Sequence, residues 1–252
     1  MRLMGLTGIG KRFYRFFAKP RANYVLAEIL VSMSDFKSLH ILQVGANDGV
    51  LYDPIHQILL KRQNVTATRI EPIAEYFDEL RDNCASIASR VELFNLCIGE
   101  EDGYIDFFLP KQSQSLRQGD KGHGSVNPEA AGRSRDGLQS RKIPCKSFNS
   151  LMSEMRTPLA DVYVSDCEGY DIQLLRKLPV AELGVKVVFI ELLQPSATTN
   201  AEKVVAWLKE AVEIVASNGF NRIVWDGNDF LSWRSPRESS AQRVEVEGFT
   251  RN

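Results

Sequence analysis

The feature that most constrains the fold is a glycine-bounded turn that directly follows a short apolar run. The run is residues 41–44, and the turn reads Gly-Ala-Asn-Asp-Gly from Gly45 to Gly49. A second apolar-leaning run, residues 65–70, ends on Glu71. Glycines let backbone N–H groups approach a ligand closely, and an acid at the end of the neighbouring strand accepts hydrogen bonds from ribose hydroxyls. The pattern predicts an open α/β sheet that binds an adenosine-containing ligand, either nicotinamide dinucleotide or S-adenosylmethionine (SAM).

The rest of the chain continues this alternation of extended and helical segments. Asp53 is predicted to cap the first helix, with Pro54 at a position where its missing N–H costs nothing. A later helix begins at a capping box formed by Thr199 and Glu202 and ends before Gly219. We predict strands at residues 41–44, 66–70, 91–96, 105–109, 143–147, 162–166 and 185–192, followed by an antiparallel hairpin of residues 221–225 and 230–233.

The order of these elements distinguishes between the two ligands. A sheet of alternating β and α units that closes with an antiparallel hairpin is typical of SAM-dependent methyltransferases, whereas a nicotinamide-binding domain continues with parallel units. The motif that Gly45 and Gly49 form also lacks the third, closely spaced glycine that brings a helix near a pyrophosphate. Because SAM has no pyrophosphate, the pattern favours SAM.

Composition narrows the function classes. The chain has 252 residues, enough for one α/β domain, and its net charge of −1 gives no electrostatic reason to expect nucleic acid as a partner. Its four cysteines show no CxxC or Cys/His pairing, so neither a zinc site nor a disulfide framework is expected. No apolar run reaches the roughly 20 residues that span a bilayer. We expect a cytoplasmic protein.

Polar and helical segments flank and interrupt the main domain, which we expect at residues 39–234. Residues 1–38 are predicted to form a helical extension in which residues 11–19 are basic and aromatic. This basic segment either belongs to a helix that packs over the domain edge or against a second copy in an oligomer, or it contacts an anionic membrane surface. Residues 111–142 form a long polar loop, which is either functional or disordered. Residues 235–252 are a polar tail, expected to be frayed.

Four short motifs, in chain order, resemble those of the FkbM-type SAM-dependent methyltransferases. They are Val-Gly-Ala-Asn-Asp-Gly at 44–49, Ile-Glu-Pro at 70–72, Asp-Cys-Glu-Gly-Tyr-Asp at 166–171 and Ile-Glu at 190–191, and the resemblance covers about residues 39–195. It implies a class I methyltransferase fold, a Rossmann-like α/β sheet that is mostly parallel with a C-terminal antiparallel hairpin, here with an N-terminal helical addition. The family is best known for O-methylation of sugar or polyketide hydroxyls.

The resemblance also implies a set of cofactor-binding residues. Glu71, followed by Pro72, would accept hydrogen bonds from the ribose hydroxyls. Ile73 would pack near the adenine, and Asn95 and Cys97 would face its edge. The methionyl part of SAM would lie against the turn residues Gly45, Ala46, Asn47, Asp48 and Gly49.

Gln43 is the one departure from the family pattern, which has Asp at this position. An amide accepts hydrogen bonds but attracts the SAM ammonium less, so Asp48 or Asp166 would have to compensate. The departure keeps open a further interpretation, a catalytically silent SAM-fold subunit. The retained acids Glu168 and Glu191 argue against that interpretation.

Methyl transfer to a hydroxyl needs an attacking oxygen in line with the S–CH₃ bond and a route for its proton, so a base or a divalent metal is expected. Asp166, at the end of a central strand, is the first candidate base; the alternative is that it only hydrogen-bonds SAM or caps the next helix. Glu168 follows the same strand and either reacts or orients the loop. Glu191 ends the adjacent strand, and with Asp166 it could hold Mg²⁺ through oxygen ligands.

His123, in the polar loop 111–142, is the only histidine whose position suits a catalytic base, and the alternative is a solvated loop residue. The loop has more Lys and Arg than Asp and Glu. This excess suits an anionic acceptor such as a phosphorylated sugar, and it equally suits an ordinary solvated loop.

We therefore expect a SAM-dependent methyltransferase that acts on a hydroxyl of a small molecule, a sugar or glycan, or another secondary metabolite. An alternative is methylation of nitrogen on a peptide or small molecule. The chain lacks the Asn/Asp-Pro-Pro-Tyr type of motif that planar nitrogen acceptors often use. The equivalent strand end reads Ser-Asp-Cys-Glu at residues 165–168.

Overall fold

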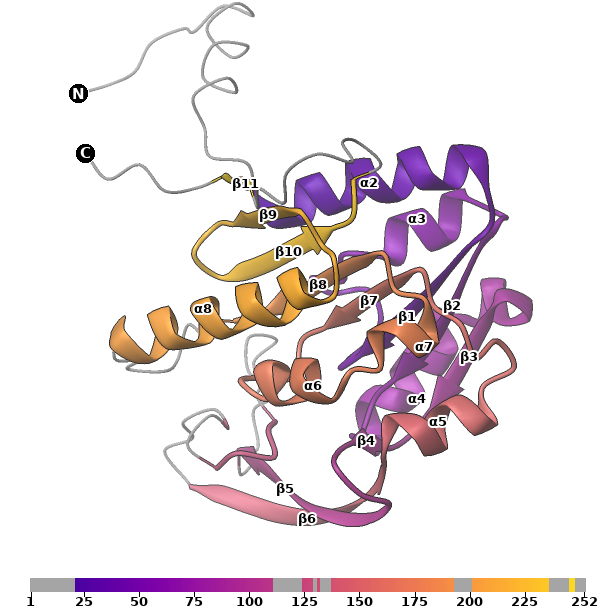
Figure 1. Ribbon diagram of the computed structural model, residues 1–252. Coiled ribbons are helices and arrows are strands. Elements are labelled where there is room, and N and C mark those ends of the chain that lie inside the picture. Colours follow the sequence, from indigo (N-terminus) through magenta and orange to yellow (C-terminus); the bar gives the residue numbers. More distant parts are fainter. Residues whose placement is uncertain are drawn as a thin grey trace, which may run out of the picture.

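The computed structural model describes most of the chain, namely residues 21–110, 124–128, 131, 137–192, 201–235 and 245–247. Within these residues an eight-stranded sheet has helices on both faces and a three-stranded sheet beside it (Figure 1). The predicted Rossmann-like α/β architecture is confirmed.

The main sheet is parallel except at one strand. Only β10 runs antiparallel to its neighbours, β8 and β9, in the part of the sheet that the structure describes. The β9–β10 pair is the antiparallel hairpin that the sequence predicts. In order across the sheet, the strands are β11 (Glu245–Glu247), β9 (Arg222–Trp225), β10 (Asp229–Trp233), β8 (Val187–Glu191), β7 (Val162–Ser165), β1 (Leu39–Val44), β2 (Val65–Ile70) and β3 (Val91–Phe94).

Two apolar layers hold the helices to the sheet. Ile41 packs into one layer, while Leu42 and Val44 pack into the other, because successive strand residues point to opposite faces. The first layer lies under α2 (Ala22–Phe36), α3 (His56–Lys61) and α4 (Ala74–Asn83). The short helix η1 (Ala85–Arg90) connects α4 to β3. The second lies under α5 (Phe148–Glu154), α6 (Asp171–Lys177), α7 (Val180–Leu183) and α8 (Ala201–Ser217).

A second, smaller sheet has the order β4 (Cys97–Ile98), β6 (Leu138–Lys146), β5 (Gly103–Pro110). Sequence analysis expects an edge-like strand at 105–109 and renewed extended structure only at residue 143. Instead β5 pairs along its whole length with β6, which begins at Leu138. The early start is due to this long-range pairing, which the polar composition of residues 138–142 does not indicate.

The helical extension at the N-terminus is described from residue 21 onward. Its helix α2 packs over the sheet, with Leu26 and Leu30 fully buried and the backbone N–H of Ala22 donating to Asp226 Oδ2 at 2.9 Å. This part of the extension therefore packs over the domain, whereas the basic segment 11–19, to which the two interpretations apply, lies outside the described residues. Among the described helices, none is long and apolar enough to cross a membrane.

Two predicted boundaries are wrong. The first helix begins at His56, three residues after Asp53, because the Asp53 carboxylate pairs with buried Arg69 and its Oδ1 accepts from the side chain of Gln43 as well as from the N–H of Ile55. In the tail, residues 245–247 are not frayed but form β11, which pairs in parallel with β9. An otherwise open strand edge offers unpaired N–H and C=O groups that such a segment can satisfy.

Helix α8 ends as the sequence predicts, at a glycine. Gly219 has φ +80°, its N–H donates to Ala216 O at 3.0 Å, and the N–H of Phe220 donates to Val215 O at 3.1 Å. These two bonds form a Schellman motif, which needs a left-handed residue at the position of Gly219.

Gly219→Ala should destabilise the protein by about 1 kcal/mol, because a Cβ is disfavoured in the left-handed region. No other heavy atom lies within 4 Å of that Cβ, so the cost arises from the backbone alone. Urea denaturation monitored by circular dichroism measures it, with Gly219→Asn as the matched control that should lose less. Equal losses in both variants would contradict the backbone explanation.

Candidate active site

The carboxyl ends of β1, β2, β7 and β8 meet at one edge of the sheet. Val44 is paired with Ile70 on one side and with Ser165 on the other, and Ser165 is paired with Ile190. The residues that follow these positions therefore come together. They include Gly45, Glu71, Asp166 and Glu191, and ligands of open α/β sheets bind at such an edge where the strand order reverses.

Gly45 allows β1 and β7 to end in close contact. Its φ is +80°, and a Cβ at this position would lie 2.0 Å from the carbonyl oxygen of Asp166. The N–H of Asp166 in turn donates to Val44 O at 3.1 Å. Only glycine fits here, because the backbone of β7 occupies the space that a side chain would need.

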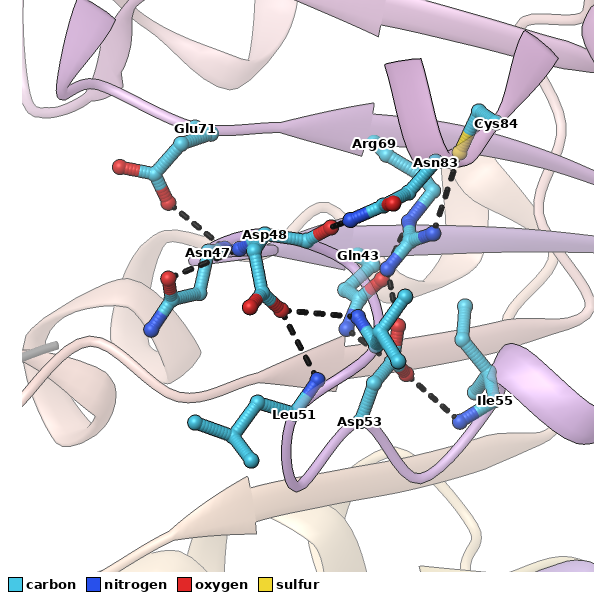
Figure 2. Close-up of polar contacts among 11 residues, drawn as sticks. Gln43, Asn47, Asp48, Leu51, Asp53, Ile55, Arg69, Glu71, Asn83 and Cys84 are labelled. Carbon is cyan, nitrogen blue, oxygen red and sulfur yellow. Dashed lines mark hydrogen bonds and ion pairs between the residues drawn. The ribbon is translucent and has the colours of Figure 1, made fainter. Parts of the chain in front are cut away.

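The turn uses its own backbone donors internally. Every N–H from Gly45 to Leu51 donates to an acceptor within the protein. Asp48 Oδ1 accepts two of them and Glu71 Oε2 accepts that of Asn47 (Figure 2). The turn therefore has no backbone donor left for a pyrophosphate, which fits SAM and does not fit a dinucleotide.

Backbone donors hold the carboxylate of Glu71 in place at the end of β2. Glu71 is 4 % exposed, and its carboxylate accepts from the N–H groups of Asn47 and Ile73 at 2.8 and 2.9 Å. Burial raises the pKa of Glu71 to about 7, with a smaller contribution from the charge of Asp166. Each carboxylate oxygen can accept more than one hydrogen bond, so capacity remains for ribose hydroxyls.

Asn95 supports Glu71 from the neighbouring strand end. Its Nδ2 donates to the carbonyl oxygens of Glu71 and Pro72 at 2.8 and 3.2 Å. Ile73 and Cys97 are buried in the core of the small sheet, beside Phe107 and its neighbours. Contact of Asn95, Ile73 and Cys97 with an adenine stays a prediction.

Gln43 and Asp48 are engaged inside the protein. Gln43 is buried, its Oε1 accepts from Arg69 Nε at 2.8 Å, and its Nε2 donates to Asp53 Oδ1 at 3.4 Å. Asp48 Oδ1 accepts from the N–H groups of Val50 and Leu51. The predicted role of either residue toward a SAM ammonium thus has to coexist with these internal bonds.

Three acids lie at the ends of β7 and β8, with Glu191 as the last residue of β8. Asp166 is exposed, whereas Glu168 and Glu191 are partly buried. Burial raises the pKa of Glu168 to about 8 and that of Glu191 to about 11, and the charge of Asp166 adds to both shifts. Asp171, fully buried in the first turn of α6, has its pKa raised by burial to about 7. At neutral pH this edge therefore holds protons as well as negative charge.

Sequence analysis missed Asn228, which orders one side of this cluster. Its Nδ2 donates to Glu191 Oε1 and to Asp229 Oδ1, both at 3.1 Å. Glu191 Oε2 is buried and finds no hydrogen-bond partner among the described residues. Asn228 follows the Asp226-Gly227 turn of the predicted hairpin, and that turn position is the signal that could have identified it.

Ser125 was also missed, and it brings part of the polar loop to the site. It is fully buried, its backbone pairs with that of Phe108, and its Oγ donates to the carbonyl oxygen of Glu168 at 2.9 Å. Glu168 itself has φ +49°, a conformation that costs energy for a residue with a side chain. His123 lies outside the described residues.

The expectation of magnesium finds no support. Within the described part of the chain, no group of three or more His, Cys, Asp or Glu side chains is arranged to hold a metal ion. Asp166 and Glu191 follow adjacent strands, as predicted, but no third ligand accompanies them there.

Comparisons with known proteins agree with this geometry. Residues 43–220, more than half of the chain, match the family model described as "Methyltransferase FkbM domain". No curated protein matches the sequence.

Among solved structures, the pyocyanin biosynthetic protein PhzM is 16% identical, with a TM-score of 0.39 over 80% of this chain and 52% of its own, so this chain spans about half its length. A putative O-methyltransferase from Klebsiella pneumoniae is 12% identical, with a TM-score of 0.43 over 92% of each chain. A SAM dependent methyltransferase from Aquifex aeolicus is 13% identical, with a TM-score of 0.39 over 82% of this chain and 87% of its own. Likenesses this distant carry no information about the chemistry of the present chain.

The raised pKa of Glu168 predicts a pH-dependent gain in stability for Glu168→Gln. Because the folded state holds this proton up to about pH 8, the wild-type protein loses stability as the pH rises from about 5 to about 8. The variant escapes this loss, so it should match the wild type at pH 5 and exceed it by about 2 kcal/mol or more at pH 8.5.

Urea denaturation at the two pH values measures the difference. Glu182→Gln, at an exposed position of α7, is the control and should change little at either pH. A Glu168→Gln gain that is the same at pH 5 and pH 8.5 would contradict the assigned protonation.

Proposed function

The chain belongs to the FkbM methyltransferase family and is a SAM-dependent methyltransferase, and we propose that it methylates a hydroxyl group of a sugar, glycan or secondary metabolite. SAM supplies an electrophilic methyl group on a sulfonium. The O–CH₃ bond forms as the S–CH₃ bond breaks, and the hydroxyl proton must pass to a base.

The residues at the strand ends fit SAM. The turn from Gly45 to Gly49 has its backbone donors engaged, and the side chains around it are acids, of which the ionised ones attract a sulfonium and an ammonium and would repel a pyrophosphate. In this proposal Glu71 orients the ribose, while the bonds that it accepts from Asn47 and Ile73 hold its carboxylate in place.

The observation that carries O-methylation is the group of acids Asp166, Glu168 and Glu191. An alcohol is a weak nucleophile at neutral pH and needs a base as it reacts. Asp166 is the most exposed of the three, so it takes the hydroxyl proton in this proposal. Glu191, with its pKa raised by burial to about 11, stays protonated and limits the repulsion that Asp166 experiences.

The same acids bear on the acceptor. A hydroxyl compound without negative charge suits an edge lined by carboxyls, whereas a phosphorylated sugar would be repelled by an ionised Asp166 and would oppose ionisation of the acids beside it. The proposed acceptor is therefore a neutral hydroxyl compound.

A panel of acceptors tests the proposal. The protein is incubated with SAM and either neutral sugars or the matched amino sugars, and release of S-adenosylhomocysteine (SAH) is recorded with mass spectrometry of the product. A methyl ether is expected from the neutral sugars. Products methylated only on nitrogen would replace this proposal with N-methylation, and SAM binding without turnover would favour a silent subunit.

The choice of cofactor is tested by ligand binding. The protein should bind SAM and SAH in calorimetric titration and should not bind NAD. Glu71→Ala should weaken SAM binding by about 1.5–3 kcal/mol, the scale of hydrogen bonds lost from a charged group. Glu75→Ala, which removes an exposed acid from the first turn of α4, should leave binding unchanged. Tighter binding of NAD than of SAH would contradict the cofactor.

Asp166→Asn tests whether Asp166 is the base. The amide preserves the shape of the side chain but cannot take up a proton, so kcat should fall by about 10²-fold or more. The affinity for SAH should change far less, which calorimetry checks on the same preparation. A variant that keeps its kcat would exclude Asp166 as the base.

A further inference from the structure

A fully buried arginine lies beside the cofactor turn. Arg69 is in β2, two residues before Glu71, and it faces the layer under α2, α3 and α4. Its guanidinium forms an ion pair with Asp53, whose side chain is 2 % exposed. Arg69 Nε donates to Gln43 Oε1 at 2.8 Å, and Nη1 donates to Cys84 Sγ at 3.4 Å (Figure 2).

Stability alone does not account for this ion pair. Removing two charges from water costs most of what their attraction returns, and apolar residues of similar volume often serve a core as well. The pair, with Gln43, lies beside the apolar cluster under α2, α3 and α4. We therefore ask whether the ion pair has a role that depends on its position beside the turn from Gly45 to Gly49.

The partners of Arg69 come from the segments that bound the turn. Gln43 lies two residues before Gly45, and Asp53 lies four residues after Gly49. Cys84 adjoins Asn83, whose Nδ2 donates to the carbonyl oxygen of Asp48 at 2.8 Å. One guanidinium thus connects both ends of the turn to the helix beside it.

The turn also rests directly on the guanidinium. A Cβ at Gly49, which has φ +75°, would lie 2.8 Å from Nη1 and 3.1 Å from Nη2 of Arg69. Three residues later, Tyr52 has φ +60°, which is unfavourable for a bulky residue. The bonds of Asp48 on one side and of Asp53 on the other hold this segment, so its shape is imposed by contacts rather than by local preference.

Charge gives the arrangement a second consequence. SAM carries a positive sulfonium that SAH lacks, and an unpaired cation beside its turn would repel it. Asp53 neutralises Arg69 and removes this repulsion.

We propose that Arg69, with Asp53 and Gln43, is a positioning unit for the cofactor turn, and that Asp53 cancels the arginine charge next to a cationic cofactor. The proposal rests on the use of SAM and does not depend on which acceptor is methylated.

The first test replaces the ion pair by apolar residues, Arg69→Met with Asp53→Leu. The melting temperature should stay close to that of the wild type, because such replacements are often neutral. The Kd for SAH should rise about tenfold or more, and KM for SAM should rise with it, while kcat and KM for the acceptor stay within about twofold, since the acceptor edge is not altered.

Leu26→Ala is the matched control for stability. It opens a cavity in the same layer, at a residue that takes no part in the hydrogen bonds of Arg69, Asp53 and Gln43, and should lower the melting temperature while leaving the Kd for SAH unchanged. A double variant that binds SAH as the wild type does would overturn the proposal, as would a loss of SAH affinity in Leu26→Ala as large as that in the double variant. Wild-type binding of SAH is measured first, so that failure of the cofactor assignment is distinguished from failure of this proposal.

Asp53→Asn tests the charge separately and decides the matter if the double variant does not fold. The amide can still accept from the N–H of Ile55, but the arginine is no longer neutralised. Binding of SAM should weaken about tenfold more than binding of SAH, because only SAM carries the sulfonium charge. Equal losses for the two ligands would overturn the charge compensation, and unchanged affinities would overturn the whole proposal.

Discussion

The site depends on the contact between Gly45 and the backbone of Asp166. Parallel strands that end in register bring their following residues together, but the separation of those residues depends on what stands between the strands. Here a Cβ would lie only 2.0 Å from the carbonyl oxygen of Asp166, so nothing separates β1 from β7. Glu71 on one side and Glu191 on the other then flank the same edge.

Crowding these acids opposes folding. Burial and mutual repulsion raise the pKa values of Glu71, Glu168 and Glu191, which means that the folded chain resists their ionisation. A cationic ligand at this edge would relieve the repulsion. The arrangement is therefore unfavourable for the protein alone and favourable for the protein with such a ligand, as is common at functional sites.

Local patterns were sufficient to predict the strands of the main sheet other than β11, the glycine turn and the position of Asp166 beside Glu191. They failed where pairing partners lie far apart in the chain. The pairing of β5 with the first half of β6 and the strand β11 are examples, because the composition of residues 138–142 and 245–247 does not indicate a strand. The polar stretch before residue 143 becomes a strand only through its partner.

Arg69 and Asp53 show the same limit at the level of side chains. A single arginine in an apolar strand does not indicate its partner, and Asp53 already had a sufficient local explanation as a helix cap. Ser125 lay in a loop that was interpreted as one polar segment, although its side chain is buried against Glu168. In each case burial by distant segments determined the role.

The small sheet has a consequence for how such a protein can diversify. Its core is separate from the two layers of the main sheet, and it joins the cofactor edge through Ile73, with Tyr76 packed against it. An insertion or exchange within β5 and β6 would alter the small sheet next to Ile73 and leave the strand pairing of the eight-stranded sheet in place. Changes can therefore accumulate in the small sheet while the residues that hold the turn from Gly45 to Gly49 are kept.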